Sequence, residues 1–274
     1  MSANKRIHIV GCSPRSGTTL ITELVVNCFE IDGFTEHELT IFKKPDKISN
    51  IFCSKYVHDI LAIRPLLYID PNLWVIFMMR DPRDVVVSRH GRDNTMYWTN
   101  LRIWKNYSYA AKRLFNHPRF LCISYEDLVT NPDKCQEYIM NKIPFLIKRA
   151  DFSNFERIVR PSQKSSRALG GVRPISSKSV GNWRQNKPRL LAQLNIHGSI
   201  TRDLLEFGYE KDDSWLQELE GIVPENLTSK WPEHLSLLEH YKQKKKSFKQ
   251  TLRYFFNTWA DRVPKKSSHN SDTA

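Results

Sequence analysis

The sequence predicts an α/β fold of three layers, in which a central parallel sheet lies between two layers of helices. Short apolar runs alternate with segments of helical periodicity through roughly the first 150 residues. A polar loop bounded by glycines joins the first apolar run to the first helical segment. At 274 residues, the chain can hold one large domain or two small ones.

The loop between the first predicted strand and the first predicted helix is suited to bind an anion. Residues 6–11 form the strand, and unpaired N–H groups at the start of the following helix point at the loop. It is not a standard triphosphate-binding loop, because Gly11 and Gly17 are one residue too far apart and Thr18 replaces the usual Lys. The cation of this loop is Arg15, whose guanidinium can donate to two oxygens of one anion.

Two further strands are predicted at 30–34 and 51–55, and ionisable residues follow both. Glu36 and Glu38 come just after the first of these strands, and His58 comes after the second. Carboxylate and imidazole groups at such strand ends are candidates for a general base.

A fourth strand is predicted at 74–79, where a continuous apolar run is typical of a strand that is buried on both faces. The run ends at Arg80. Asp81 and Pro82 then form a helix start, with Asp81 as the N-cap and Pro82 in the first helical position. The helix is expected to continue for two turns and to include Ser88.

The next segments continue the alternation. A helix is expected near 97–116, where Trp98 and Trp104 share one face and favour a place in the core. Residues 120–124 form a fifth strand, which leads into a turn at Tyr125, and a further helix follows. Residues 161–182 are rich in Ser, Gly, Arg and Lys, so we expect a mobile loop that a bound ligand would order.

The main domain is expected to span residues 1–210, followed by a helical extension at 211–264 and a disordered tail at 265–274. Apolar residues recur at helical spacing in the extension, beside several lysines: Phe248, Leu252, Phe255 and Trp259. This composition favours a helix that docks on the domain with a solvated face. The alternative is a helix that contacts a membrane surface or a substrate.

Composition narrows the class of ligand and the compartment. The formal net charge of +13 favours anionic ligands, yet no zinc-finger spacing or RNA-recognition motif is present, so nucleic acid is not expected. The five cysteines are predicted to be buried thiols in a reducing compartment. No signal peptide and no apolar run of about 20 residues is found, which predicts a cytoplasmic protein.

Several segments of the chain resemble the sulfotransferase family. Pro14–Thr19 resembles the family's 5′-phosphosulfate-binding loop, and Arg80–Asp84 with Ser88 resembles its 3′-phosphate site. Tyr125–Leu128 is similar to a run whose Tyr lies beside the adenine in the family. Ser179–Arg184 resembles the family's late Gly-x-Trp element. The resemblance covers most of the chain.

The resemblance implies a P-loop-like phosphosulfate-binding loop and 3′-phosphoadenosine 5′-phosphosulfate (PAPS) as the co-substrate. It assigns contacts with that co-substrate to Arg15, Ser16, Gly17, Thr18, Thr19, Arg80, Ser88, Tyr125, Lys178, Ser179, Val180 and Gly181. Arg173 and Arg167 are further basic candidates in the late loop. For each of them, a side chain exposed to solvent is as well supported as a contact with the co-substrate. No metal is expected to be required, because a sulfuryl group carries less charge than a phosphoryl group.

The resemblance also implies catalytic roles. Arg15 would stabilise the transferring group. The separation of Glu36 from Arg15 resembles that of the catalytic Glu in protein-tyrosine and related sulfotransferases. His58 resembles the catalytic His of the cytosolic small-molecule enzymes, but Lys55 lies three residues before it, where that group has two. These patterns favour Glu36 as the general base, with Glu38 and His58 as alternatives.

The expected function is therefore the transfer of a sulfuryl group from PAPS to a hydroxyl or amine acceptor. Carbohydrate, lipid-linked, small-molecule and peptide acceptors all remain open, as does the oligomeric state. Two alternatives are a kinase-like P-loop phosphotransferase and a non-catalytic anion-binding protein of the same fold.

Overall fold

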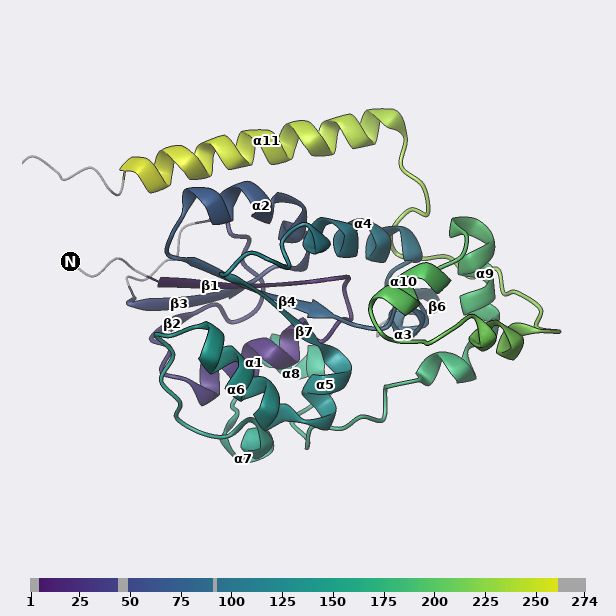
Figure 1. Ribbon diagram of the computed structural model, residues 1–274, viewed down its shortest axis with the longest axis horizontal. Helices are drawn as coiled ribbons and strands as arrows, with labels where there is room; N and C mark the ends of the chain where they lie inside the picture. The colour runs from purple at the N-terminus through teal and green to yellow at the C-terminus, as the bar shows by residue number, and fades with distance from the viewer. Residues whose placement is uncertain (1–4, 44–48, 91–92, 261–274) are drawn as a thin grey trace, which may run out of the picture.

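The central layer of the protein is a five-stranded parallel sheet with the strand order β2-β3-β1-β4-β7 (Figure 1). This computed structural model describes residues 5–43, 49–90 and 93–260. The strands of the sheet are β1 (Lys5–Gly11), β2 (Gly33–Phe34), β3 (Ile51–Lys55), β4 (Leu73–Met79) and β7 (Phe120–Ser124). Each neighbouring pair is parallel, which confirms the predicted sheet and brings the carboxyl ends of the strands to one edge.

The central strands are apolar on both faces because helices cover both sides of the sheet. In β4, Ile76 and Met78 belong to one buried cluster, whereas Val75 and Phe77 belong to another. This alternation follows from the two-residue period of a strand. It divides the core into two halves, one on each side of the sheet.

Helices cover both faces of the sheet, as the three-layer prediction requires (Figure 1). One face packs against α1 (Thr18–Cys28), α5 (Tyr125–Thr130), α6 (Pro132–Lys142) and α7 (Phe155–Ile158). The other face packs against α2 (Ile60–Ile69) and α4 (Leu101–Lys112). Short 3₁₀ helices at Val57–Asp59 and Phe152–Asn154 precede α2 and α7. All five cysteines are free thiols.

The segment after β4 differs from the prediction at its end. Helix α3 (Pro82–Val86) begins as expected, with the Asp81 carboxylate accepting a hydrogen bond from the Arg83 N–H at 2.8 Å. It then stops, so the prediction of a helical Ser88 is wrong. Consecutive β-branched residues weaken its last turn. The chain continues as β5 (Arg89–His90), which pairs antiparallel with β6 (Asp93–Tyr97).

This hairpin also shortens the helix that was expected near 97–116, since α4 begins only at Leu101. The Asn100 side chain caps its start by accepting a hydrogen bond from the Ile103 N–H at 3.2 Å. Trp104 is fully buried, as predicted, and its indole N–H donates to the Arg80 carbonyl oxygen at 2.9 Å. Trp98 lies outside the helix and is only half-buried.

The segment 161–182, which was expected to be a loop, contains helix α8 (Gln163–Leu169). The Ser162 hydroxyl caps its start by accepting a hydrogen bond from the Ser165 N–H at 3.2 Å. Gly170, with φ at 72°, ends it in the left-handed conformation. Ser165 is buried against α1. A cap at each end and contact with α1 thus stabilise a helix whose composition is polar.

A third cluster of buried residues lies beyond the sheet edge, around α9 (Lys187–His197) and α10 (Thr201–Glu206). Trp183 and Trp215 form its centre, with ring centroids 6.2 Å apart in an edge-to-face arrangement. They belong to 3₁₀ helices at Asn182–Gln185 and Ser214–Leu219.

The last described element is α11 (Leu237–Ala260), which runs over the outer side of α2 (Figure 1). No helix within the described ranges is both long and apolar enough to cross a membrane. The tail predicted at 265–274 and the side chain of Trp259 lie outside the residues that the structure describes.

Candidate functional site

The loop that follows β1 turns at two residues with left-handed backbone conformations. Arg15 has φ of 74° and Gly17 has φ of 88°. Arginine rarely adopts this conformation, so the surrounding structure holds Arg15 under backbone strain. Ser16 is fully buried, and its hydroxyl donates to the Ser13 carbonyl oxygen at 2.7 Å. Because α1 begins at Thr18, its first N–H groups face this loop.

Arg80, at the end of β4, joins three segments that are far apart in the sequence. Its Nη1 donates to the Arg15 carbonyl oxygen at 2.8 Å, and its Nη2 donates to the Ser179 carbonyl oxygen at 2.9 Å. The Arg15 Nε in turn donates to Ser88 Oγ at 2.9 Å. The structure thus brings together four residues that the sequence assigned to the same ligand.

Tyr125 forms one side of this group. The guanidinium carbon of Arg80 lies 4.2 Å from the centroid of its ring, in a cation–π contact. The Tyr125 hydroxyl lies 2.7 Å from Ser179 Oγ. A Cβ at Gly17 would lie 2.5 Å from Cδ2 of the same ring, so only glycine fits there. Tyr125 belongs to α5, not to the turn that was expected.

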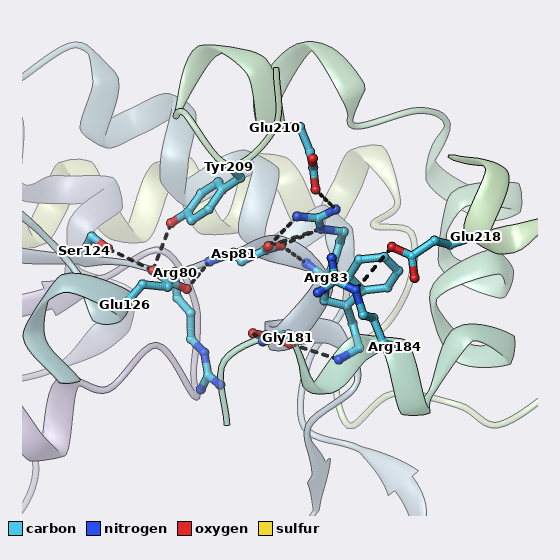
Figure 2. A network of polar contacts seen from close by, with 12 residues as sticks. Arg80, Asp81, Arg83, Ser124, Glu126, Gly181, Arg184, Tyr209, Glu210 and Glu218 are labelled. Carbon is cyan, nitrogen blue, oxygen red and sulfur yellow. Dashed lines mark hydrogen bonds and ion pairs between the residues drawn. The ribbon is translucent and has the colours of Figure 1, made fainter. Parts of the chain in front are cut away.

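A buried polar network fixes the backbone around Arg80 (Figure 2). The Asp81 N–H donates to Glu126 Oε1 at 3.0 Å. Arg83 donates to both carboxylate oxygens of Asp81 and forms an ion pair with Glu210. Figure 2 shows the Arg80 side chain extending away from this network. The network therefore holds the end of β4 in place and leaves the Arg80 guanidinium for the site.

Asp84 fixes the late loop. Its carboxylate accepts hydrogen bonds from the Gly181 N–H at 2.7 Å and from the Trp183 N–H at 3.0 Å. Burial raises the pKa of this carboxyl group. The contacts hold the chain that carries Lys178 and Ser179 against α3.

These residues surround a cavity of about 1040 Å³. Nine of the residues with a predicted ligand contact line it, namely Arg15, Gly17, Thr18, Thr19, Arg80, Ser88, Tyr125, Lys178 and Ser179. Arg89 and Arg173 add two further cations to its lining. The other three, Ser16, Val180 and Gly181, are not among the lining residues. Ser16 is fully buried within the loop, the Gly181 N–H donates to Asp84, and Val180 is 40% exposed. The cavity is large enough for a nucleotide-sized ligand.

The charges in the cavity fit an anion. Burial lowers the pKa of Arg15, and the positive charge of Arg80 lowers it further. Within the described part of the chain, the buried Nε of Arg80 has no hydrogen-bond partner. Two neighbouring cations repel each other in a partly desolvated site unless an anion compensates them. The residues present therefore fit a ligand with phosphate groups.

Lys55, at the end of β3, is a candidate that the predicted contacts did not include. Its side chain is buried, and its Nζ donates to Thr19 Oγ1 in the anion loop at 2.9 Å. Burial lowers its pKa, and the carboxylates of Glu38 and Glu23 oppose this. Its position at the end of the strand predicted at 51–55 was the signal in the sequence.

The three candidate bases follow two neighbouring strands of the sheet: Glu36 and Glu38 come after β2, and His58 comes after β3. Glu36 is exposed, and its carbonyl oxygen accepts hydrogen bonds from the hydroxyls of Ser162 and Ser165 in the α8 region. Glu38 is also exposed, and its negative charge acts on both Lys55 and His58. None of the three candidates is among the described residues that line the cavity.

His58 lies in an aromatic group. Its Nδ1 is 2.5 Å from the Tyr107 hydroxyl, and its ring makes edge-to-face contacts with Tyr56 and Trp231. Burial lowers the pKa of His58, whereas the charges of Glu38 and Asp59 raise it. His58 thus contacts α4 and the segment before α11. Lys55, by contrast, contacts the anion loop.

Comparison with known proteins identifies a family over part of the chain. Residues 32–143 match a model described as the sulfotransferase family, which confirms the resemblance found in the sequence. The matched range includes Lys55, Arg80, Ser88 and Tyr125 and begins after the anion loop.

Solved structures to which this chain is similar include two sulfotransferases. The sulfotransferase domain of the Synechococcus PCC 7002 olefin synthase has a TM-score of 0.41 at 16% identity, covering 67% of this chain and 89% of that chain. Mouse sulfotransferase SULT7A1 complexed with PAP has a TM-score of 0.42 at 13% identity, covering 74% and 89%. No curated protein sequence matches the chain.

Proposed function

Because residues 32–143 match the sulfotransferase family, we propose that the protein transfers a sulfuryl group from PAPS to a hydroxyl or amine acceptor. The observation that carries this proposal is the pair Arg15 and Arg80 in one cavity, linked by a hydrogen bond of 2.8 Å and tied to Ser88 and Ser179. PAPS would supply the activated sulfuryl group and a 3′-phosphate by which the protein holds it.

The binding roles follow from the positions of the side chains. Arg80 and Ser88 would bind the 3′-phosphate, and Lys178 and Arg173 in the late loop would add positive charge beside it. Arg15 and the N–H groups at the start of α1 would bind the 5′-phosphosulfate. The apolar part of the cavity wall, which would accept the adenine, includes Leu20, Val129, Phe155, Leu169 and Ile175.

Fixed cations in this arrangement would stabilise the charge that develops on the transferring group and the leaving phosphate. Arg15, in the loop itself, would supply one of these cations. Lys55 would supply a second cation, because its ammonium group is hydrogen-bonded to Thr19 in the same loop. Binding of the remote 3′-phosphate would position the donor for in-line transfer.

The general base would come from Glu36, Glu38 or His58. We favour Glu38, because its negative charge opposes the lowering of the pKa of Lys55, which is hydrogen-bonded to the anion loop. The acceptor would then lose its proton to the carboxylate of Glu38. Glu36 has the separation from Arg15 that the resemblance implies. Single variants of Glu36 and Glu38 distinguish these two candidates.

A kinase-like phosphotransferase is the weaker account of the site. The loop has Thr18 where such an enzyme has its phosphate-binding Lys, and its cation is the strained Arg15. A non-catalytic anion-binding protein would share the cavity and the cations, and it differs from an enzyme only in lacking turnover.

We also propose that residues 1–210 form the catalytic domain and residues 211–264 a helical extension. The extension would pack on the domain, since Trp215 is buried against Trp183. The five free thiols support a reducing compartment such as the cytoplasm.

The test is acceptor-dependent turnover. The purified protein would be incubated with PAPS and a panel of phenols, sugars and amines, and formation of 3′-phosphoadenosine 5′-phosphate (PAP) would be measured. We expect an acceptor that accelerates PAP formation in the wild type and not in Glu38→Gln. Tight PAP binding with no turnover on any acceptor would favour the non-catalytic alternative.

A further inference from the structure

Helix α11 packs against the domain with its polar side. Residues Ser247, Gln250, Thr251 and Tyr254 recur at three- and four-residue spacing and are the residues between Leu237 and Phe256 that are partly or fully covered. The Tyr254 hydroxyl donates to Asp70 Oδ2 at 2.7 Å, and its ring meets Phe42 edge-to-face. The covered side of α11 is therefore made of polar side chains, of which Tyr254 is the most deeply buried.

The apolar side of the same helix faces away from the domain. Four of its side chains are strongly exposed, with exposed fractions of 61% for Tyr241, 65% for Phe248, 42% for Phe255 and 60% for Phe256. Leu252 lies between them on the helix surface and is 42% exposed. An amphipathic helix that docks on a core normally buries this side and exposes its polar side. Here the arrangement is reversed, so the apolar stripe is available to something outside the domain.

Basic residues border the apolar stripe. On a helical projection they lie beside it or within it, and they are Lys242, Lys244, Lys245, Lys246, Lys249 and Arg253. All six are exposed. Between Leu237 and Phe256 the sequence contains a single acidic residue, Glu239. The outward side of α11 thus combines exposed aromatic rings with a concentrated positive charge.

We propose that α11 lies on the surface of an anionic lipid bilayer, with its aromatic stripe among the acyl chains and its lysines at the lipid headgroups. A basic polar flank with aromatic and leucine side chains is the pattern of helices that lie in the plane of a membrane interface. A second copy of the chain is a poorer occupant, because it would bring two sets of like charges together. Contact with a neutral partner would leave the lysines without a counter-charge.

The test is co-sedimentation of the full-length protein with lipid vesicles at about 0.1 M salt. One preparation contains phosphatidylcholine alone, and the other contains one quarter phosphatidylglycerol. We expect binding to the anionic vesicles only, and loss of binding at high salt. Phe248→Gln/Phe255→Gln should lower the partition coefficient on the order of tenfold or more, and so should Lys245→Gln/Lys249→Gln.

Matched control variants change the same chemistry elsewhere on the surface. Ile147→Gln/Val223→Gln removes two exposed apolar side chains, and Lys134→Gln/Lys142→Gln removes two exposed charges from α6. Both should bind anionic vesicles as the wild type does. Should the aromatic variant fail to fold, Leu238→Gln/Tyr241→Gln tests the same stripe at the other end of the helix, where the side chains are 61% exposed.

Several outcomes would overturn the proposal. One is equal binding to neutral and anionic vesicles, and another is equal loss in the test and control variants. A third is a wild type that binds neither vesicle and is a dimer in solution, with Phe248→Gln/Phe255→Gln a monomer, since the stripe would then be covered by a second copy. PAP binding should be unchanged in all five double variants, which separates this inference from the proposed function.

Discussion

Arg15 Nε donates a hydrogen bond to Ser88 Oγ at 2.9 Å, and this contact connects the first βα loop to the chain that follows β4. The two residues are 73 positions apart in the sequence. Arg80 completes the connection through the carbonyl oxygen of Arg15. The parts assigned to the two phosphate groups of the donor are therefore already joined, so a change in one part should alter binding at the other.

Removal of the Arg80 guanidinium should abolish tight binding of PAP. Arg80→Ala removes a cation that lies over Tyr125 and reaches two loops, and charge-assisted hydrogen bonds to an anion contribute about 1.5–3 kcal/mol each. We expect PAP affinity, measured by calorimetry, to fall roughly 10- to 100-fold. Arg113→Ala removes an exposed cation from the end of α4 and should leave the affinity unchanged. An equal loss in both variants would show that the effect is one of net charge.

A methyl group at Gly17 should damage the site more than the same group at another left-handed glycine. Gly17 and Gly208 have φ of 88° and 75°, so an Ala at either costs about 1–2 kcal/mol in backbone strain. Only at Gly17 would the new Cβ meet the Tyr125 ring, at 2.5 Å, whereas Gly208 has no atom within 4 Å. Chemical denaturation should show that Gly17→Ala lowers the free energy of unfolding at least as much as Gly208→Ala does. PAP binding should be lost in Gly17→Ala alone. Retained binding would contradict the packing of Tyr125 on the loop.

The general base is tested by removing one charge at a time. Glu38→Gln should lower kcat by roughly 10²- to 10⁴-fold with little change in PAP affinity, because the base acts on the acceptor. Glu30→Gln removes a charge from an exposed residue near the start of β2 and serves as the control. A larger loss in Glu36→Gln than in Glu38→Gln would assign the role to Glu36. A loss in His58→Gln alone would assign it to the imidazole.

Stability should fall in mild acid because of His8. Its ring is fully buried, with Nδ1 2.8 Å from Ser54 Oγ and Nε2 3.0 Å from Asp59 Oδ2. Burial lowers its pKa below the ordinary value of 6.5, so the unfolded chain binds this proton more readily than the folded protein does. Stability from His8 is therefore fully present above pH 6.5 and decreases as the pH falls toward the lowered folded-state pKa.

The measurement is urea unfolding at about pH 7.5 and pH 5.5, and the contribution of His8 to the difference should be about 1 kcal/mol. In His8→Gln the decrease between the two values should be smaller by that amount. His240 is exposed at the start of α11, so His240→Gln should show the same decrease as the wild type. An unchanged decrease in His8→Gln would contradict a neutral buried imidazole.

The strands and the anion loop could be predicted because local patterns determine them. The apolar run at 74–79, with Arg80 at its end and Asp81 and Pro82 after it, gives both the strand and the helix start. The position of Ser88 could not be predicted in this way. It depends on the pairing of β5 with β6 and on the hydrogen bond from the Trp98 N–H to the Ser88 carbonyl oxygen. A contact of that kind leaves no periodic signal in the sequence.

The same distinction applies to the site and to α11. The sequence indicates that Arg15, Arg80 and Tyr125 belong to the site. The stacking of Arg80 on Tyr125, however, arises only when β4 and β7 pair. The bond from Lys55 to Thr19 likewise depends on the pairing of β3 with β1. The amphipathic pattern of α11 was visible in the sequence, whereas the side that docks on α2 was not.

The most direct test of the central claim is a calorimetric titration with PAP, alongside ADP and magnesium-ATP. The arrangement of Arg15, Arg80 and Ser88 predicts binding of PAP in the micromolar range, and much weaker binding of ADP, which lacks the 3′-phosphate. Magnesium-ATP should bind little. Preference for magnesium-ATP, or equal affinity for PAP and ADP, would contradict the assignment of Arg80 and Ser88 to a 3′-phosphate and with it the proposed sulfuryl transfer.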